Sequence, residues 1–326
     1  MTALAQQPTT APKRARRGRS DDRAPHGETL TRAAAWLRRA PMLPALIFMI
    51  IVTQLPFVAT IVISFIHWNA LYPNDVGFAG FSNYVGVFTD PAMRASVITT
   101  IELTVIVVLV SLVIGLGVAL LLDRAFWGRK FVRTIMIAPF LIVPVASALV
   151  WKHAIFNPSY GLLNGILTWF WNLFGLHNPP QVDWISAHPL GAVNTALIWQ
   201  WTPFMMLILL AGLQSRPLDV IEAARIDGAG NWQIFRYMTL PHLRSYLELA
   251  ALLGCIYIVQ NFDAVYTITS GGLGTANLPY TIYQKFFEAH DYGGASAAGV
   301  IVVIGSLIVA TVALRTVSTL LREEKR

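Results

Sequence analysis

Polar and aromatic side chains interrupt an otherwise apolar stretch of the chain between residues 257 and 266. They are Tyr257, Gln260, Asn261, Asp263 and Tyr266. Small-molecule sites combine apolar and aromatic surface with a few polar groups, and a hydroxyl-rich ligand needs hydrogen bonds plus a ring to lie against. Helical spacing places Tyr257, Asn261 and Gln260 on one side. The stretch therefore predicts either a pathway for a hydroxyl-rich ligand or a polar contact between two helices.

The usual catalytic and cofactor motifs are absent from the sequence. It contains no G-x-x-x-x-G-K-[ST] segment and no Gly-Lys pair, so it has no standard cradle for nucleotide phosphates. It also lacks the H-E-x-x-H and G-x-S-x-G patterns. Cys255 is the single cysteine, which excludes an internal disulfide and a cysteine-rich metal centre. We therefore expect no catalytic residue, metal or cofactor on this chain.

The composition is that of an integral membrane protein. Apolar residues make up 55% of the 326 positions and charged residues 13%, whereas soluble domains average about 45–50% and about 25%; the mean hydropathy is +0.57. Windows of about 20 apolar residues can cross a bilayer, and they fall at 42–66, 97–122, 134–150, 189–213, 246–268 and 296–317. We predict an all-α protein with six transmembrane helices. Residues 161–176 form a shorter apolar run with Asn and Trp, and we expect a helix lying on the outer membrane surface.

Lysine and arginine alternate between the segments that separate these windows. If the odd-numbered segments are cytoplasmic, only Arg94, Lys152 and Lys285, out of 24, lie outside. The positive-inside rule then places both termini in the cytoplasm. The net charge of +7 is thus mainly a topology signal, and we expect no nucleic-acid partner. We predict a multi-pass protein of the cell membrane, with a basic tail and interfacial helix over 1–41, a six-helix transmembrane domain over 42–318 and a cytoplasmic tail over 319–326.

The predicted cytoplasmic segment 214–245 has more apolar residues than a simple connection needs. Leu218 and Ile221 share one side of a predicted short helix. Gly228 can supply the left-handed backbone that breaks this helix. Asn231 is expected to cap a second helix, and Pro241 to end it. The two helices predict a surface that another protein covers.

One motif in this segment is specific. Glu222, Ala223, Ala224, Asp227 and Gly228, followed by Leu240-Pro241, resemble the EAA loop of binding-protein-dependent ABC importer permeases. The longer EAAxxDGA form is similar to the sugar-importer branch, of the maltose and glycerol-phosphate type. Residues 262–266 and 277–283 agree with this resemblance, and the latter are similar to polyol (mannitol or sorbitol) permeases.

The resemblance implies a function and a set of partners. The EAA loop would dock in a groove of a separate ATPase, which carries the ATP and magnesium that this chain does not bind. The partners implied are a second homologous permease, two copies of the ATP-binding subunit, an extracytoplasmic binding protein and a sugar or polyol. The seven motif residues would form the coupling site, and the residues between 257 and 266 the substrate pathway.

Two other classes of protein remain open. A proton-coupled secondary transporter would use Asp263 or Glu248 as its proton carrier. A carboxylate within a span costs about 2.5–3.5 kcal/mol, so each of these residues requires a partner or a water-filled cavity. Glu248 has a simpler explanation, since Arg244 is spaced for an i, i+4 ion pair. A membrane enzyme would need a clustered polar site. The EAA-like motif and the lack of such a cluster count against both.

Overall fold

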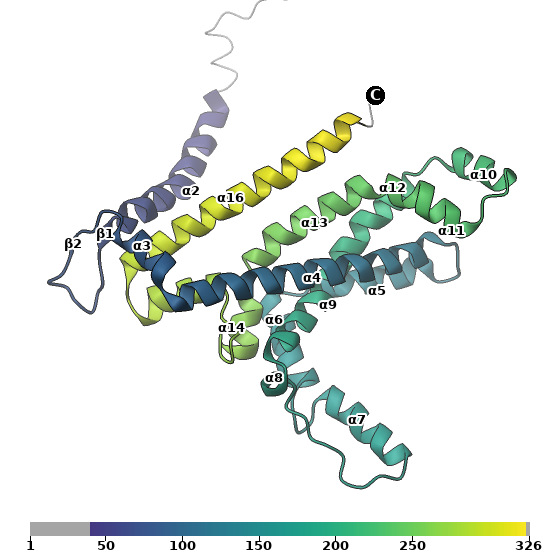
Figure 1. The fold of residues 1–326 in the computed structure, drawn as a ribbon, viewed down its shortest axis with the longest axis horizontal. Helices are drawn as coiled ribbons and strands as arrows, with labels where there is room; N and C mark the ends of the chain where they lie inside the picture. Colours follow the sequence, from purple (N-terminus) through teal and green to yellow (C-terminus); the bar gives the residue numbers. More distant parts are fainter. Residues whose placement is uncertain (1–39, 324–326) are drawn as a thin grey trace, which may run out of the picture. The chain divides into compact units, whose positions relative to one another are not determined.

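A computed structural model describes residues 40–323 (Figure 1). The predicted tail and interfacial helix before residue 40, and the last three residues of the predicted C-terminal tail, lie outside the described residues. The chain divides into two compact units, residues 1–55 and 56–326. We describe each unit by itself.

The described part of the first unit consists of the 3-10 turn η1 and the beginning of α2. Their bounds are η1 (Ala40–Met42) and α2 (Leu43–Ser64). Among the described residues, α2 is one of three helices that are long and apolar enough to cross a membrane. The other two are α4 (Pro91–Asp123) and α9 (Pro189–Gln214).

The second unit begins with the rest of α2, and a short hairpin that the all-α prediction missed follows. Strands β1 (Ile66–His67) and β2 (Gly77–Phe78) pair antiparallel, with Ile66 opposite Phe78. Helix α3 (Ser82–Thr89) follows, and then α4. Asp90 caps α4 by accepting the Ala92 N–H (2.9 Å), and its carboxylate lies 2.7 Å from the Lys285 ammonium. The hydrogen bond from Lys285 holds the pKa of Asp90 below its ordinary value.

The remaining elements are mostly short helices between longer ones. After α4 the chain forms α5 (Arg129–Leu141), α6 (Pro144–Leu149), the π-helix η2 (Val150–Ile155), α7 (Leu162–Leu173), α8 (Trp184–Ala187) and α9. The predicted coupling segment contains α10 (Leu218–Ile226), α11 (Asn231–Ile234), the π-helix η3 (Phe235–Thr239) and α12 (Leu240–His242). The chain ends with α13 (Arg244–Val259), α14 (Asp263–Thr269), α15 (Leu278–Tyr283), the π-helix η4 (Gln284–Glu288) and α16 (Tyr292–Glu323). α7 confirms the helix expected within 161–176, and its place on a membrane surface stays a prediction.

Two of the predicted spans are broken rather than continuous. The window 134–150 is divided between α5 and α6, which meet at 97°, because the residue before Pro144 disfavours helical backbone. The window 246–268 is divided between α13 and α14 by residues 260–262. If residues 129–141 with 144–155, and residues 231–242 with 244–259, each count as one span, the described chain has up to five spans by length and composition. Helix α16 is apolar over Tyr292–Ile308, its continuous stretch of described side chains.

Helices α4 and α9 lie side by side and form the centre of the second unit (Figure 1). A methyl group added at Gly115 of α4 would lie 3.0 Å from the backbone nitrogen of Met206 and 3.3 Å from the carbonyl oxygen of Thr202. The two helix backbones therefore approach at a glycine, as in other membrane bundles. Toward the ends of both helices, a buried apolar cluster includes Leu122, Leu213 and Leu243.

This close approach predicts a large difference between two neighbouring glycines of α4. Gly115→Leu should lower the free energy of unfolding by about 1–3 kcal/mol, because the new side chain meets the α9 backbone. Gly117→Leu is the matched control, since no atom of the described chain lies within 4 Å of a Cβ placed there. Thermal unfolding of both variants in detergent measures the effect, and equal midpoints would contradict the packing.

Candidate functional site

The EAA-like motif forms a helix that ends in a left-handed glycine. Gly228 has φ +90°, its N–H donates to the carbonyl of Arg225 (3.1 Å), and the N–H of Ala229 donates to the carbonyl of Ala224 (2.9 Å). These two bonds define a Schellman motif at the end of α10. A Cβ at residue 228 would meet nothing within 4 Å in the described chain. The positive backbone angle therefore favours glycine here, as the sequence predicts, whereas there is room for a side chain.

The second short helix differs from the prediction in two details. Gly230, and not Asn231, is its N-cap, and the Gly230 N–H donates to the side-chain oxygen of Gln233 (2.8 Å). The helix also continues past Pro241, which occupies the first turn of α12, where a missing N–H is tolerated. The change of direction comes at Leu243, where residues 231–242 and 244–259 meet at 56°.

Several large apolar side chains of this segment are exposed, among exposed charged ones. Leu218, Val220 and Ile226 on α10, and Trp232 and Tyr237 beyond the glycine turn, are all exposed, Ile226 by 86%. We name these five residues the coupling surface. Of the motif residues, Glu222, Ala223, Asp227, Gly228 and Pro241 are exposed, and Ala224 and Leu240 are half-buried. Large apolar side chains that remain exposed together typically mark an interaction site.

Arg216 connects the base of this segment to the helices, and the sequence analysis did not single it out. Its Nε donates to the carbonyl of Leu213 (2.8 Å), and its Nη1 to the hydroxyl of Thr239 (3.0 Å). Its Nη2 donates to the carboxylate of Asp123, at the end of α4. In the sequence analysis, Arg216 contributed only to the topology prediction. It lies 93 positions from Asp123, and no spacing pattern links two residues so far apart.

A second set of contacts joins the end of α9 to the start of α13. The Ser215 hydroxyl lies 3.1 Å from Nε2 of His242 and 2.9 Å from the hydroxyl of Tyr246. A Cβ at Gly212 would lie 2.6 Å from the Tyr246 ring. The segment 215–243 is therefore held by close contacts at both of its ends.

The predicted pathway residues lie on both sides of the break between α13 and α14. Tyr257 is on α13 and stacks on Trp201 of α9, with ring centroids 5.4 Å apart. Gln260 and Asn261 lie in the non-helical break, so the expectation that they share a helix side with Tyr257 is wrong. Asp263 and Tyr266 belong to α14, where Asp263 occupies the first turn.

Asn277 holds the broken backbone in place. Its amide donates to the carbonyl oxygen of Asn261 (2.5 Å), and its own carbonyl oxygen accepts the Tyr280 N–H (3.2 Å) at the start of α15. Asn277 is fully buried. The buried side-chain oxygen of Asn261 has no hydrogen-bond partner within the part of the chain that the structure describes.

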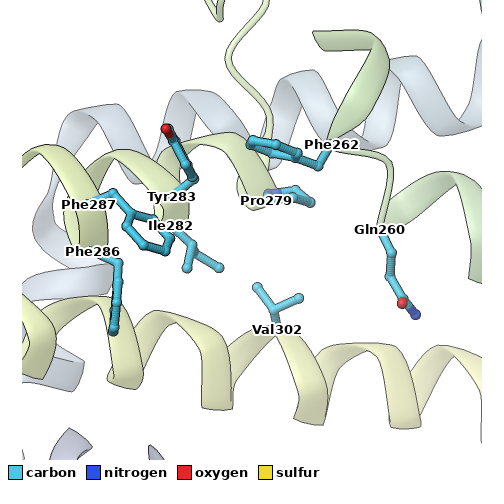
Figure 2. A pocket seen from close by; sticks show the side chains of 8 residues that line it. All are labelled: Gln260, Phe262, Pro279, Ile282, Tyr283, Phe286, Phe287 and Val302. Carbon is cyan, nitrogen blue, oxygen red and sulfur yellow. The ribbon is translucent and has the colours of Figure 1, made fainter. Parts of the chain in front are cut away.

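A cavity of about 570 Å³ lies beside the break (Figure 2). Its lining residues are Gln260, Phe262, Pro279, Ile282, Tyr283, Phe286, Phe287 and Val302. Figure 2 shows Val302 of α16 facing Ile282 and Pro279, with the Gln260 amide at one end. Of the predicted pathway residues, only Gln260 lines this cavity. The aromatic rings that surround it were not identified from the sequence, although their i, i+3 and i, i+4 spacing was a readable signal.

The acidic residues do not gather into a centre. Glu248 and Arg244 form the predicted i, i+4 ion pair, with Nε 3.1 Å from Oε1. Within residues 40–323, no three His, Cys, Asp or Glu side chains lie together in a way that could hold a metal ion.

Comparison with known proteins establishes the family. Residues 111–322, which include the coupling surface and the break, match the family described as the binding-protein-dependent transport system inner membrane component. The chain belongs to this family of inner-membrane proteins. This confirms both the resemblance noted in the sequence and the predicted location in the cell membrane.

Individual relatives include permeases named for sugars. The chain is 33% identical over 264 residues to the trehalose/maltose transport system permease protein MalF of Thermococcus litoralis, covering 80% of this chain and 86% of the relative. It is 31% identical over 259 residues to the trehalose transport system permease protein SugA of Mycobacterium tuberculosis, covering 79% and 81%. Its fold is similar to a chain of a bacterial ABC transporter that imports alginate, with a TM-score of 0.74, 21% identity and coverage of 88% and 96%.

Proposed function

We propose that this chain is a permease subunit of an ABC importer for a sugar, coupled to a separate ATPase through α10–α12. The observation that carries the proposal is the coupling surface itself. A Schellman turn at Gly228 fixes two short helices, and their large apolar side chains are exposed within the region that matches the family. A partner that covers this surface would bury them.

The coupling segment can transmit motion because it is held at its base. ATP binding closes a pair of ATPase subunits, which would carry the coupling surface with them as a rigid body. ATP must bind one state of the transporter more tightly than the other for this to shift the population. The ATP and magnesium belong to two copies of the partner ATPase, and this chain supplies no nucleotide site.

The pathway is proposed to be shared with a second, homologous permease. Six spans result if each bent pair crosses the membrane once and α16 forms the last span, with both termini in the cytoplasm. An extracytoplasmic binding protein would deliver the substrate, as the alginate transporter has been crystallised with a pentasaccharide-bound periplasmic protein. The names of MalF and SugA support a sugar, and the polyol assignment stays a prediction from residues 277–283.

The region around the α13–α14 break is proposed to line the pathway. Tyr257 is exposed and already stacks on Trp201. The buried side-chain oxygen of Asn261 has no partner among the described contacts, and Gln260 lies at one end of the aromatic-lined cavity (Figure 2). Rings plus amide groups suit a hydroxyl-rich ligand. A proton-coupled mechanism has less support, because Arg244 neutralises Glu248.

The coupling assignment predicts that changes at the coupling segment abolish uptake without affecting membrane insertion. Gly228→Asp strains the φ +90° turn and adds charge to the surface, and Glu222→Lys reverses an exposed charge. Each should lower the uptake of radiolabelled sugar by about tenfold or more. Gly128→Asp is the matched control, because Gly128 also has a positive φ (+86°) with no described atom within 4 Å of a Cβ. Normal uptake in both coupling variants would refute the assignment.

The pathway assignment predicts a different pattern of defects. Asp263→Asn and Asn261→Ala should each lower the rate of substrate-stimulated transport by about fivefold or more. Basal ATP hydrolysis by the complete transporter should change little. Glu102→Gln is the control, since Glu102 is an exposed carboxylate on the apolar helix α4. Proteoliposome transport and phosphate release measure the two activities. If neither variant changes transport, the break is a structural contact between helices.

A further inference from the structure

We propose that Arg216 is a positioning residue that connects the coupling surface to α4, so that movement of the ATPase reaches this helix as well as α9 and α13. The inference rests on the proposed function, because it concerns the path that coupling takes within this chain. It assigns to Arg216 and Asp123 a role that the EAA-like motif does not include.

The connectivity of the chain leaves α4 without a covalent link to this segment. Residues 215–243 continue covalently into α9 on one side and α13 on the other. Helix α4 ends at Asp123, far away in sequence, and receives motion from this segment only through non-covalent contacts. Within residues 40–323, the Arg216–Asp123 pair is the one hydrogen bond or ion pair between α4 and this segment.

A single guanidinium contacts three separate elements. It holds the last turn of α9 through the Leu213 carbonyl, the π-helix η3 through the Thr239 hydroxyl, and α4 through Asp123. Thr239 is only 2% exposed, and the side chains of Arg216 and Asp123 are 15% and 24% exposed. A planar fork with five N–H donors can satisfy three partners in fixed directions, whereas a lysine ammonium acts as a point charge.

The pair is suited to setting orientation more than to holding the segment in place. Leu122, Leu213 and Leu243 belong to one buried apolar cluster, which joins α4, α9 and the residue between α12 and α13 without directional preference. A largely buried ion pair is weak evidence for stability, but it can select one arrangement among several. The cluster therefore keeps the elements together, and Arg216 fixes the angle at which α10–α12 meet α4.

The test uses the complete transporter, co-expressed with its partner subunits, purified and reconstituted in proteoliposomes. Arg216→Gln and Asp123→Ala should each lower the amount of sugar transported per ATP hydrolysed by about fivefold or more, with the ATPase still bound. The double variant should lose no more than either single variant, because both remove one interaction. Arg216→Lys and Asp123→Asn should recover part of the loss. Arg124→Gln, the exposed neighbour, should match the unchanged protein.

Several outcomes would overturn the inference. An unchanged transport ratio in both single variants would do so, as would losses that add in the double variant. A fall in thermal stability that matches the loss of transport, with no recovery by Arg216→Lys, would make the role structural only.

If the first variants do not accumulate, Thr239→Val removes one of the three contacts without creating an unpaired charge, and normal coupling in that variant refutes the inference. Failure of the unchanged chain to retain an ATPase would instead refute the proposed function.

Discussion

Every break in a helix of this chain frees backbone groups, and within an apolar environment those groups must find partners inside the protein. The structure supplies them with side chains from distant segments. Asn277 donates to the carbonyl of Asn261, and Lys152 donates to the carbonyl of Thr267 (2.8 Å) at the end of α14. Arg216 donates to the carbonyl of Leu213 from only three residues further along the chain. These bonds allow the helices to stop and turn at defined places.

The places where the helices turn are also the places where function is proposed. The break at residues 260–262 places Gln260 and Phe262 beside a cavity that is lined by further aromatic rings. The turn at Gly228 exposes two short helices, and the bend at Leu243 redirects the chain into α13. The proposed binding and coupling sites therefore both depend on irregular backbone that long helices such as α4 and α9 hold in position.

Features that depend on nearby residues were predictable from the sequence. The left-handed Gly228 and the Arg244–Glu248 pair follow from local spacing, and both are confirmed. The break after Val259 was not predictable, because the bond that stabilises it comes from Asn277, 16 residues beyond Asn261. The Arg216–Asp123 contact joins residues 93 positions apart, with no pattern to reveal it. Pro144 did give a local signal for the bend between α5 and α6, but the surrounding apolar run favoured a continuous span.

The central claim is that this chain works as one subunit of a transporter whose energy comes from a separate ATPase. The most direct measurement is affinity purification of the tagged chain from membranes in mild detergent, followed by quantitative mass spectrometry. The account predicts a second multi-span permease and an ATP-binding subunit in fixed stoichiometric ratio to this chain. A chain that purifies alone, or only with copies of itself, and whose uptake collapses with a protonophore but survives ATP depletion, would contradict it.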